Sequence, residues 1–100
     1  MSAYQVEIAP AAERDIRDAF LWYRERNALI ADAFRSEALD TIDRIGATPH
    51  GKAEDTEGNR RRVLHRFPYS VVYEVNETVV TILAVTHHRR QPGYWRAMNH

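Results

Sequence analysis

The longest apolar run of the chain, TVVTILAV, spans residues 78–85 and shows almost no polar alternation. That pattern predicts a strand buried on both faces in the middle of a sheet. The run is followed by His87, His88, Arg89 and Arg90, which would gather positive charge and hydrogen-bond donors at one end of that strand. We therefore expect this strand to form the centre of the fold, and its basic end to be a place where a site could be held rigidly.

The beginning of the chain predicts a short strand followed by a helix. Residues 4–8, YQVEI, alternate apolar and polar side chains, as in a strand with one buried face. Pro10 favours the first position of a helix, because its missing N–H costs nothing there. We expect the helix to run to about Arg26, with Asn27 as its stop. Its apolar residues recur at helical spacing: Ala12, Ile16, Ala19, Phe20 and Tyr23.

A second helix is predicted from near Leu29 to a stop formed by Gly46 and Pro49. One stripe of this helix is apolar and should face the core: Ile30, Phe34, Ala38, Ile42 and Ile45. Charged residues mostly occupy the opposite side: Arg35, Glu37, Asp40, Asp43 and Arg44. Because the connection is so short, the two helices should form an antiparallel hairpin.

The second half of the chain predicts a loop and then three strands. Residues 50–59 are polar and without periodicity, which favours a loop. Residues 62–67 and 70–75 predict two strands separated by a turn at Pro68-Tyr69. Asn76-Glu77 is a candidate two-residue hairpin turn into the central strand. We expect one face to hold Val71, Tyr73, Val75, Val80, Ile82 and Ala84. We expect the other, mixed face to hold Val72, Glu74, Thr81, Leu83, Val85 and His87, with something covering it.

Taken together, the elements predict an α+β fold. An N-terminal strand precedes an antiparallel helical hairpin, and a three-stranded antiparallel meander completes one sheet with the helices packed on one of its faces. One hundred residues with 44% hydrophobic content suffice for one core, so residues 1–100 should form a single domain.

Composition narrows the function classes. The chain has no cysteine, which excludes disulfides and thiolate zinc sites. The first ten residues lack the basic and apolar regions of a signal peptide, and no stretch is long enough to span a bilayer, so we expect a cytoplasmic protein. No glycine-rich phosphate loop and no metal-ligand spacing is present, so no cofactor and no metal is implied.

The net charge of zero hides a division along the chain. Residues 1–57 carry 7 basic and 12 acidic side chains, whereas residues 58–100 carry 7 basic and 2 acidic ones. This asymmetry favours an electropositive face that binds a polyanion or an acidic peptide, although the two halves could also simply attract each other. Arg60, Arg61 and Arg62, with Arg66 nearby, are typical of a phosphate- or carboxylate-binding patch. They could equally be the solvated start of a strand.

A family resemblance is carried by the order of elements and by two segments. These are RRRVLHRFPYSVVYEV at residues 60–75 and ILAVTHHRRQPGYW at residues 82–95. Both resemble the toxins of bacterial type II toxin–antitoxin systems in the ParE/RelE superfamily, over essentially the whole chain. The resemblance implies either of two activities. RelE-like members cut messenger RNA on the ribosome, whereas ParE-like members poison DNA gyrase without chemistry of their own.

Individual positions favour the ParE-like branch. By resemblance, RelE-like toxins place a catalytic arginine three residues before the strand tyrosine that corresponds to Tyr73, and here Ser70 stands in that place. Val63 stands where those toxins have a lysine, whereas the basic position two residues earlier is kept as Arg61. The C-terminal aromatic is matched by Tyr94. We therefore expect a gyrase-poisoning toxin that a cognate antitoxin neutralises, in a toxin–antitoxin hetero-oligomer. The alternatives are a ribosome-dependent mRNA endonuclease and an inactive antitoxin-binding module.

The resemblance and the residues together give three candidate sets. A ribonuclease would use His87, His88, Tyr94 and Arg61, with proton transfer by the imidazoles or the phenol and charge stabilisation by the guanidinium. The target-binding set is Arg61, Arg62, Arg66, His87, Arg89, Arg90 and Tyr94. The antitoxin-binding set is Trp22, Tyr23, Leu39, Arg60, Arg61 and Arg62, and we expect the antitoxin to supply carboxylates to the arginines. His87 and His88 should point to opposite faces of their strand, so they make a poor metal site.

Overall fold

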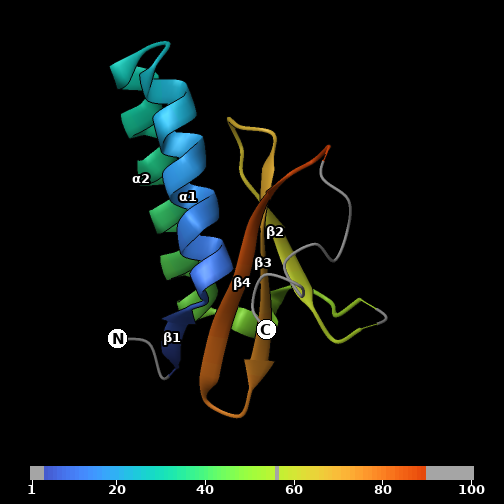
Figure 1. Ribbon diagram of the computed structural model, residues 1–100. Coiled ribbons are helices and arrows are strands. Elements are labelled where there is room, and N and C mark those ends of the chain that lie inside the picture. The colour runs from blue at the N-terminus through green and yellow to red at the C-terminus, as the bar shows by residue number, and fades with distance from the viewer. Residues whose placement is uncertain (1–3, 56, 90–100) are drawn as a thin grey trace.

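The computed structural model describes residues 4–55 and 57–89 as two helices packed on one face of a four-stranded sheet (Figure 1). Along the chain the elements are β1 (Gln5–Ile8), α1 (Pro10–Arg24), α2 (Ala28–Ala47), the 3-10 turn η1 (Pro49–Gly51), β2 (Arg60–Val63), β3 (Tyr69–Asn76) and β4 (Val79–His87). The predicted α+β order of one strand, two helices and an antiparallel meander is confirmed.

The strands lie in the order β1-β4-β3-β2. β2, β3 and β4 pair antiparallel, whereas β1 pairs parallel to β4, a pairing made possible by the long connection through the helices. The apolar run at residues 78–85 therefore does form an interior strand. Within the described residues, neither helix is long and apolar enough to cross a membrane.

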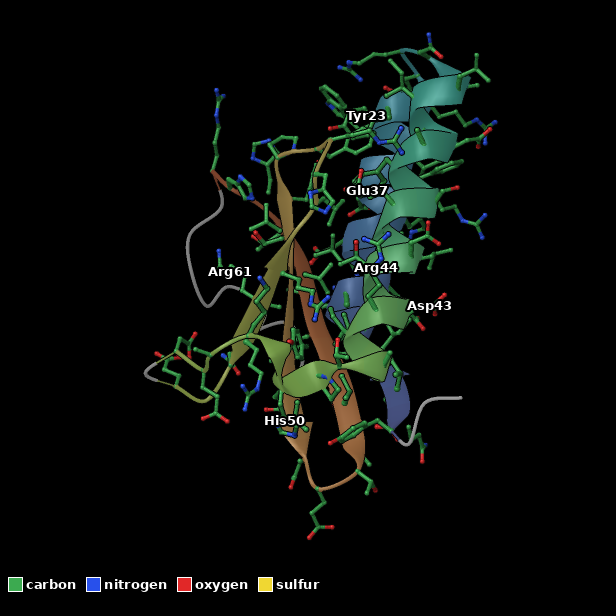
Figure 2. All side chains as sticks on the ribbon, turned by 180° about the vertical axis from the view of Figure 1, so that it is seen from behind. Tyr23, Glu37, Asp43, Arg44, His50 and Arg61 are labelled. Atoms are coloured by element: carbon green, nitrogen blue, oxygen red, sulfur yellow. The ribbon has the colours of Figure 1, made fainter. Side chains whose placement is uncertain are left out.

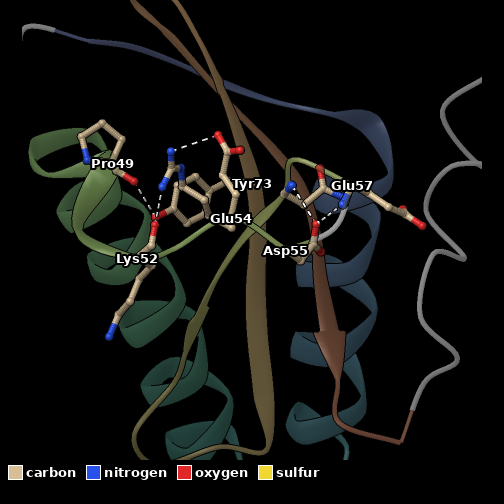
Figure 3. A network of polar contacts seen from close by, with 8 residues as sticks. Pro49, Lys52, Glu54, Asp55, Glu57 and Tyr73 are labelled. Atoms are coloured by element: carbon tan, nitrogen blue, oxygen red, sulfur yellow. Dashed lines mark hydrogen bonds and ion pairs between the residues drawn. The ribbon is translucent and has the colours of Figure 1, made fainter.

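Large apolar side chains from both layers fill the space between the helices and the sheet. Phe34, Ile45, Tyr73 and Ile82 are fully buried in one cluster. The hydroxyl of Tyr73 would be costly to bury without a partner, and it donates to the carbonyl oxygen of Pro49 at 2.8 Å. This bond ties the centre of β3 to the start of η1 (Figure 3).

A β-bulge changes the expected faces of β4. Val72 pairs with Ala84, but the next residue of β3, Tyr73, pairs with Ile82, so Leu83 is one residue extra. The extra residue reverses the alternation beyond it, and Val85 joins the main core, where Ala84 was expected. Ala84 instead clusters with Val72 and Ala11 and is buried there. The predicted placement of Ala84, Val85 and His87 is therefore wrong, because strict alternation cannot reveal a bulge: His87, expected on the mixed face, pairs with Tyr69 on the core side.

Asp15 of α1 is buried beside this bulge. The pairing of β1 with β4 stops at Ile8 and Ile82, and beyond that point α1 lies against β4. There the carboxylate of Asp15 accepts a hydrogen bond from the backbone N–H of Val85, with 3.0 Å between N and Oδ2. Asp15 thus supplies β4 with an acceptor where the short neighbouring strand has ended.

The helix boundaries differ from the prediction around the hairpin turn. α1 ends at Arg24, and Asn27 caps the following helix: its Oδ1 accepts from the backbone N–H of Leu29 at 2.9 Å and of Ile30 at 3.3 Å. At the far end, α2 continues through Gly46 to Ala47. Ile30 was expected in the buried stripe, but it is 44% exposed. The reason is that the hairpin end extends beyond the strands, so the first turn of α2 has no sheet to pack against (Figure 1).

The strand predicted at residues 62–67 ends early, because the backbone after Val63 forms hydrogen bonds with Glu37. β2 stops at Val63, and the carboxylate of Glu37 on α2 accepts hydrogen bonds from the backbone N–H groups of His65 and Arg66. It also pairs with Nε of Arg66 at 3.2 Å, so Glu37 does not lie on the solvent side of its helix as expected. Burial alone would raise the pKa of Glu37, but these hydrogen bonds and the Arg66 charge outweigh it and lower the pKa below its ordinary value.

The turn between β3 and β4 lies one residue later than predicted. Asn76 still pairs with Val79, so the two turn residues are Glu77 and Thr78. Glu77 has a φ of 56°, in the left-handed region that a tight hairpin turn requires.

Asp15→Ala should reduce the free energy of unfolding by about 1–3 kcal/mol, because the buried N–H of Val85 loses its acceptor. Urea denaturation measures this, and amide exchange at Val85 should accelerate. Asp18→Ala, one turn along the same helix at an exposed position, is the control and should stay within about 0.5 kcal/mol of the wild type. Equal effects of the two variants would contradict the role of Asp15.

Glu37→Ala should also cost about 1–3 kcal/mol at pH 7, since the His65 and Arg66 donors lose a charged acceptor. The folded-state pKa is lowered, so this contribution is complete above the ordinary glutamate pKa of about 4.3 and is lost as the pH falls through the lower folded-state value. Unfolding measured from pH 7 to pH 3 should show the two proteins converging. Asp40→Ala, at an exposed position on the same helix, should show neither effect.

Candidate functional site

The two histidines at the end of β4 lie on opposite faces of the sheet, as predicted. The ring of His87 lies 5.1 Å from that of Tyr69, whereas Nε2 of His88 lies 3.1 Å from Oγ of Ser70. Tyr69 and Ser70 are consecutive in β3, so their side chains point to opposite sides. The structure thus separates the two imidazoles of the ribonuclease set. Arg90 and Tyr94 lie outside the described residues.

His87 belongs to an aromatic cluster between the sheet and the helices. Its neighbour Tyr69 also contacts Phe34 at 5.0 Å between ring centroids, and Phe67 contacts Phe34 at 5.4 Å. Tyr23 joins them from α1, 5.3 Å from Phe67. His87 is partly buried, and its Nδ1 accepts from the backbone N–H of Arg89 at 3.1 Å. These contacts give His87 and Tyr23 internal packing roles.

Two of the three consecutive arginines of β2 hold the preceding loop. Arg60 donates to the carbonyl oxygen of Lys52 and pairs with Glu54 at 3.0 Å (Figure 3). Arg62 donates to the carbonyl and the hydroxyl of Thr48, at 3.2 and 3.1 Å. Their guanidinium groups are therefore engaged inside the protein, although both were expected to meet a partner.

Arg61 differs from its two neighbours. It is exposed, and within the part of the chain that the structure describes it forms no ion pair. It pairs across the ladder with Val72, while Val63 pairs with Ser70, so Arg61 shares a face with the hydroxyl that holds His88. We call this face, which carries Arg61, Ser70 and His88 away from the main core, the outer sheet face.

The outer sheet face brings together part of the predicted site. Arg61 and His88 are exposed on it, and the exposed Arg89 follows directly in sequence. At its centre Ser70 is buried and neutral. Such a surface can bind an acidic or phosphate group through two or three cations, and His88 is the described imidazole there that could transfer a proton.

The remaining predicted site residues are Arg66 and the candidates on the two helices. Arg66 is exposed but paired with Glu37. Trp22 is 51% exposed, with the guanidinium of Arg26 3.6 Å above its ring, and Leu39 is 39% exposed. Both remain accessible on the helices.

Sequence reasoning missed several exposed apolar residues. Leu29 is 78% exposed, and Leu21 and Ile30 accompany it at the hairpin end. Helical periodicity assigned Ile30 to the core because it cannot show where the sheet ends. Arg44 and Lys52 were also missed as neighbours of Arg61 and Arg62, since they are distant in sequence. No group of three or more histidine or acidic side chains within residues 4–55 and 57–89 could hold a metal ion.

Comparison with known proteins assigns the family. A search of curated proteins gives no match. Among solved structures, one similar chain is described as "Chromosomal ParDE TA system from P. aeruginosa", with a TM-score of 0.76 and 16% sequence identity, over 85% of this chain and 96% of that one. Residues 6–92 match the family described as "ParE toxin of type II toxin-antitoxin system, parDE". Because this match spans most of the sequence, the chain belongs to the ParE toxin family.

Proposed function

We propose that this ParE-family protein inhibits growth by binding and poisoning DNA gyrase in the cytoplasm, and that a cognate antitoxin neutralises it. The observation that carries the choice of target is Ser70. A RelE-like nuclease would need a cation at this strand position to stabilise the charge that develops on the phosphate. Here a buried neutral hydroxyl stands there and is engaged with His88.

The separation of the two histidines supports the same choice. Cleavage of RNA by its own 2′-OH needs one group to remove a proton and another to protonate the leaving oxygen, both within reach of one phosphate. His87 packs on Tyr69 on the helix side, and His88 is held by Ser70 on the outer sheet face. Two imidazoles on opposite sides of a sheet do not serve one phosphate.

The outer sheet face is the proposed contact with gyrase. Arg61 projects from β2, whose backbone is fixed by ladder pairing with β3, and His88 and Arg89 follow directly after the end of β4. Exposed arginines on a rigid element are typical anchors in protein interfaces. Arg62 is less suited, because its guanidinium is already bound to Thr48.

The hairpin end and helix faces are the proposed antitoxin contact. Leu21, Trp22, Leu29 and Ile30 expose apolar surface around the turn between α1 and α2, and Leu39 adds to it along α2. An antitoxin segment that folds on binding could cover such a surface with an amphipathic helix. A toxin–antitoxin hetero-oligomer would then bury the apolar side chains that the isolated fold leaves exposed.

The test incubates the purified protein with gyrase, ATP and supercoiled plasmid, followed by detection of linear DNA from a trapped cleavage complex. We expect linear product. Arg61→Ala should reduce it about tenfold or more at a given toxin concentration, as for the loss of an interface anchor.

Arg35→Ala, an exposed arginine on α2, is the matched control and should behave like the wild type. No linear product with gyrase shown to be active would refute the gyrase proposal. In that case, defined cuts in messenger RNA on ribosomes that disappear in His88→Ala would establish the nuclease instead. Absence of both activities and of growth arrest would indicate an inactive antitoxin-binding protein.

A further inference from the structure

A basic hollow lies between the C-terminal half of α2 and β2, the edge strand of the sheet. It has a volume of about 300 Å³, at the lower end of the range for small-ligand sites. Four basic residues from three separate segments contribute to its lining: Arg44 from α2, Lys52 from the loop after η1, and Arg61 and Arg62 from β2. Figure 2 shows Arg44 on α2 and Arg61 on β2. His65, Thr41, Val63 and Leu64 complete the lining, and no carboxylate takes part.

The positive charge of this hollow is not neutralised inside the protein. Within residues 4–55 and 57–89, none of Arg44, Lys52, Arg61 and Arg62 forms an ion pair. Glu37, which lines a neighbouring hollow with Asp40 and Arg44, is engaged by His65 and Arg66. Like charges that converge without counter-charges repel one another, and an anion bound among them removes that repulsion.

Thr48 links the two elements that carry Arg44 and Arg62. Its backbone N–H and its hydroxyl both donate to the carbonyl oxygen of Arg44, at 3.0 and 3.2 Å. The same hydroxyl and the carbonyl of Thr48 accept Nη2 of Arg62. The end of α2 and the strand β2 are thus held together through one residue. The cations of the hollow therefore sit on a backbone that is already ordered before any ligand binds, which lowers the entropic cost of binding.

We propose that the basic hollow binds a phosphate group, carried either by a nucleotide or by the backbone of a nucleic acid. The basic residues of the lining come from a helix, a loop and a strand, so they lie on different sides of the hollow instead of along one element. A phosphate presents oxygens in several directions and suits such convergence, whereas a carboxylate has two coplanar oxygens. The guanidinium group of Arg44 is the main expected donor, with Lys52 as a point charge. This inference does not depend on gyrase as the target.

Titration calorimetry on the full-length protein tests the site with inorganic pyrophosphate, ATP and a short DNA duplex as separate probes. We expect saturable binding that weakens as salt rises. Arg44→Gln and Lys52→Gln should each weaken binding about threefold to tenfold. With the duplex, each should also reduce the slope of log affinity against log salt by about 1. Equal urea midpoints of wild type and variants confirm that the fold is kept.

Arg35→Gln, on the same helix as Arg44 but outside the lining, is the matched control and should leave affinity unchanged. Tighter binding of the duplex than of pyrophosphate and ATP identifies a nucleic-acid backbone as the source, and the reverse order identifies a free phosphate. The proposal is overturned by absence of saturable binding to all three probes, by an equal loss in Arg35→Gln, or by stronger binding of a polyglutamate peptide than of any phosphate probe.

Discussion

The arrangement of the molecule depends on the extra residue in β4. Without the bulge at Leu83, strict alternation would turn Ala84 toward the helices and Val85 toward the outer sheet face. His87 would then leave the aromatic cluster and join the side of Ser70. The bulge is accompanied by Asp15, whose carboxylate accepts the N–H of Val85 where β1 no longer runs beside β4. One inserted residue and one buried carboxylate thus decide which titratable groups face outward.

Arginine serves two different purposes in this fold. The guanidinium groups of Arg60 and Arg62 donate hydrogen bonds that hold the loop at residues 48–59. Arg66 instead forms an ion pair with Glu37, and this contact sets the path of residues 64–68. The Glu37 contact takes the place of the last part of the strand that the alternation predicted at residues 62–67. Arg44 and Arg61 have no such internal charge partner in the described part of the chain, and they are the ones left for ligands. Consecutive arginines in the sequence therefore do not all contribute to one basic surface in the fold.

The uneven charge along the chain has a structural counterpart. The acidic first half does not simply neutralise the basic second half. Glu37 and Glu54 each pair with one arginine from the later part, but Asp40 and Asp43 on α2 are exposed. Arg44, at the end of the same acidic helix, instead faces the hollow beside β2. The ion pairs of Glu37 and Glu54 show that the two halves attract each other in part, and the basic residues beside β2 are the candidates for the predicted electropositive face.

The sequence by itself determined the elements and their order. Periodicities of two and of 3.6 residues are local properties, so the interior strand, the helical hairpin and the α+β class followed from them, and the opposite orientation of His87 and His88 followed from their adjacency. Tertiary structure alone decided the rest. Four features depend on contacts between residues far apart in the chain, which no local pattern encodes: the bulge at Leu83, the exposure of Ile30 beyond the end of the sheet, the internal use of Arg60 and Arg62, and the position of Arg44 beside β2.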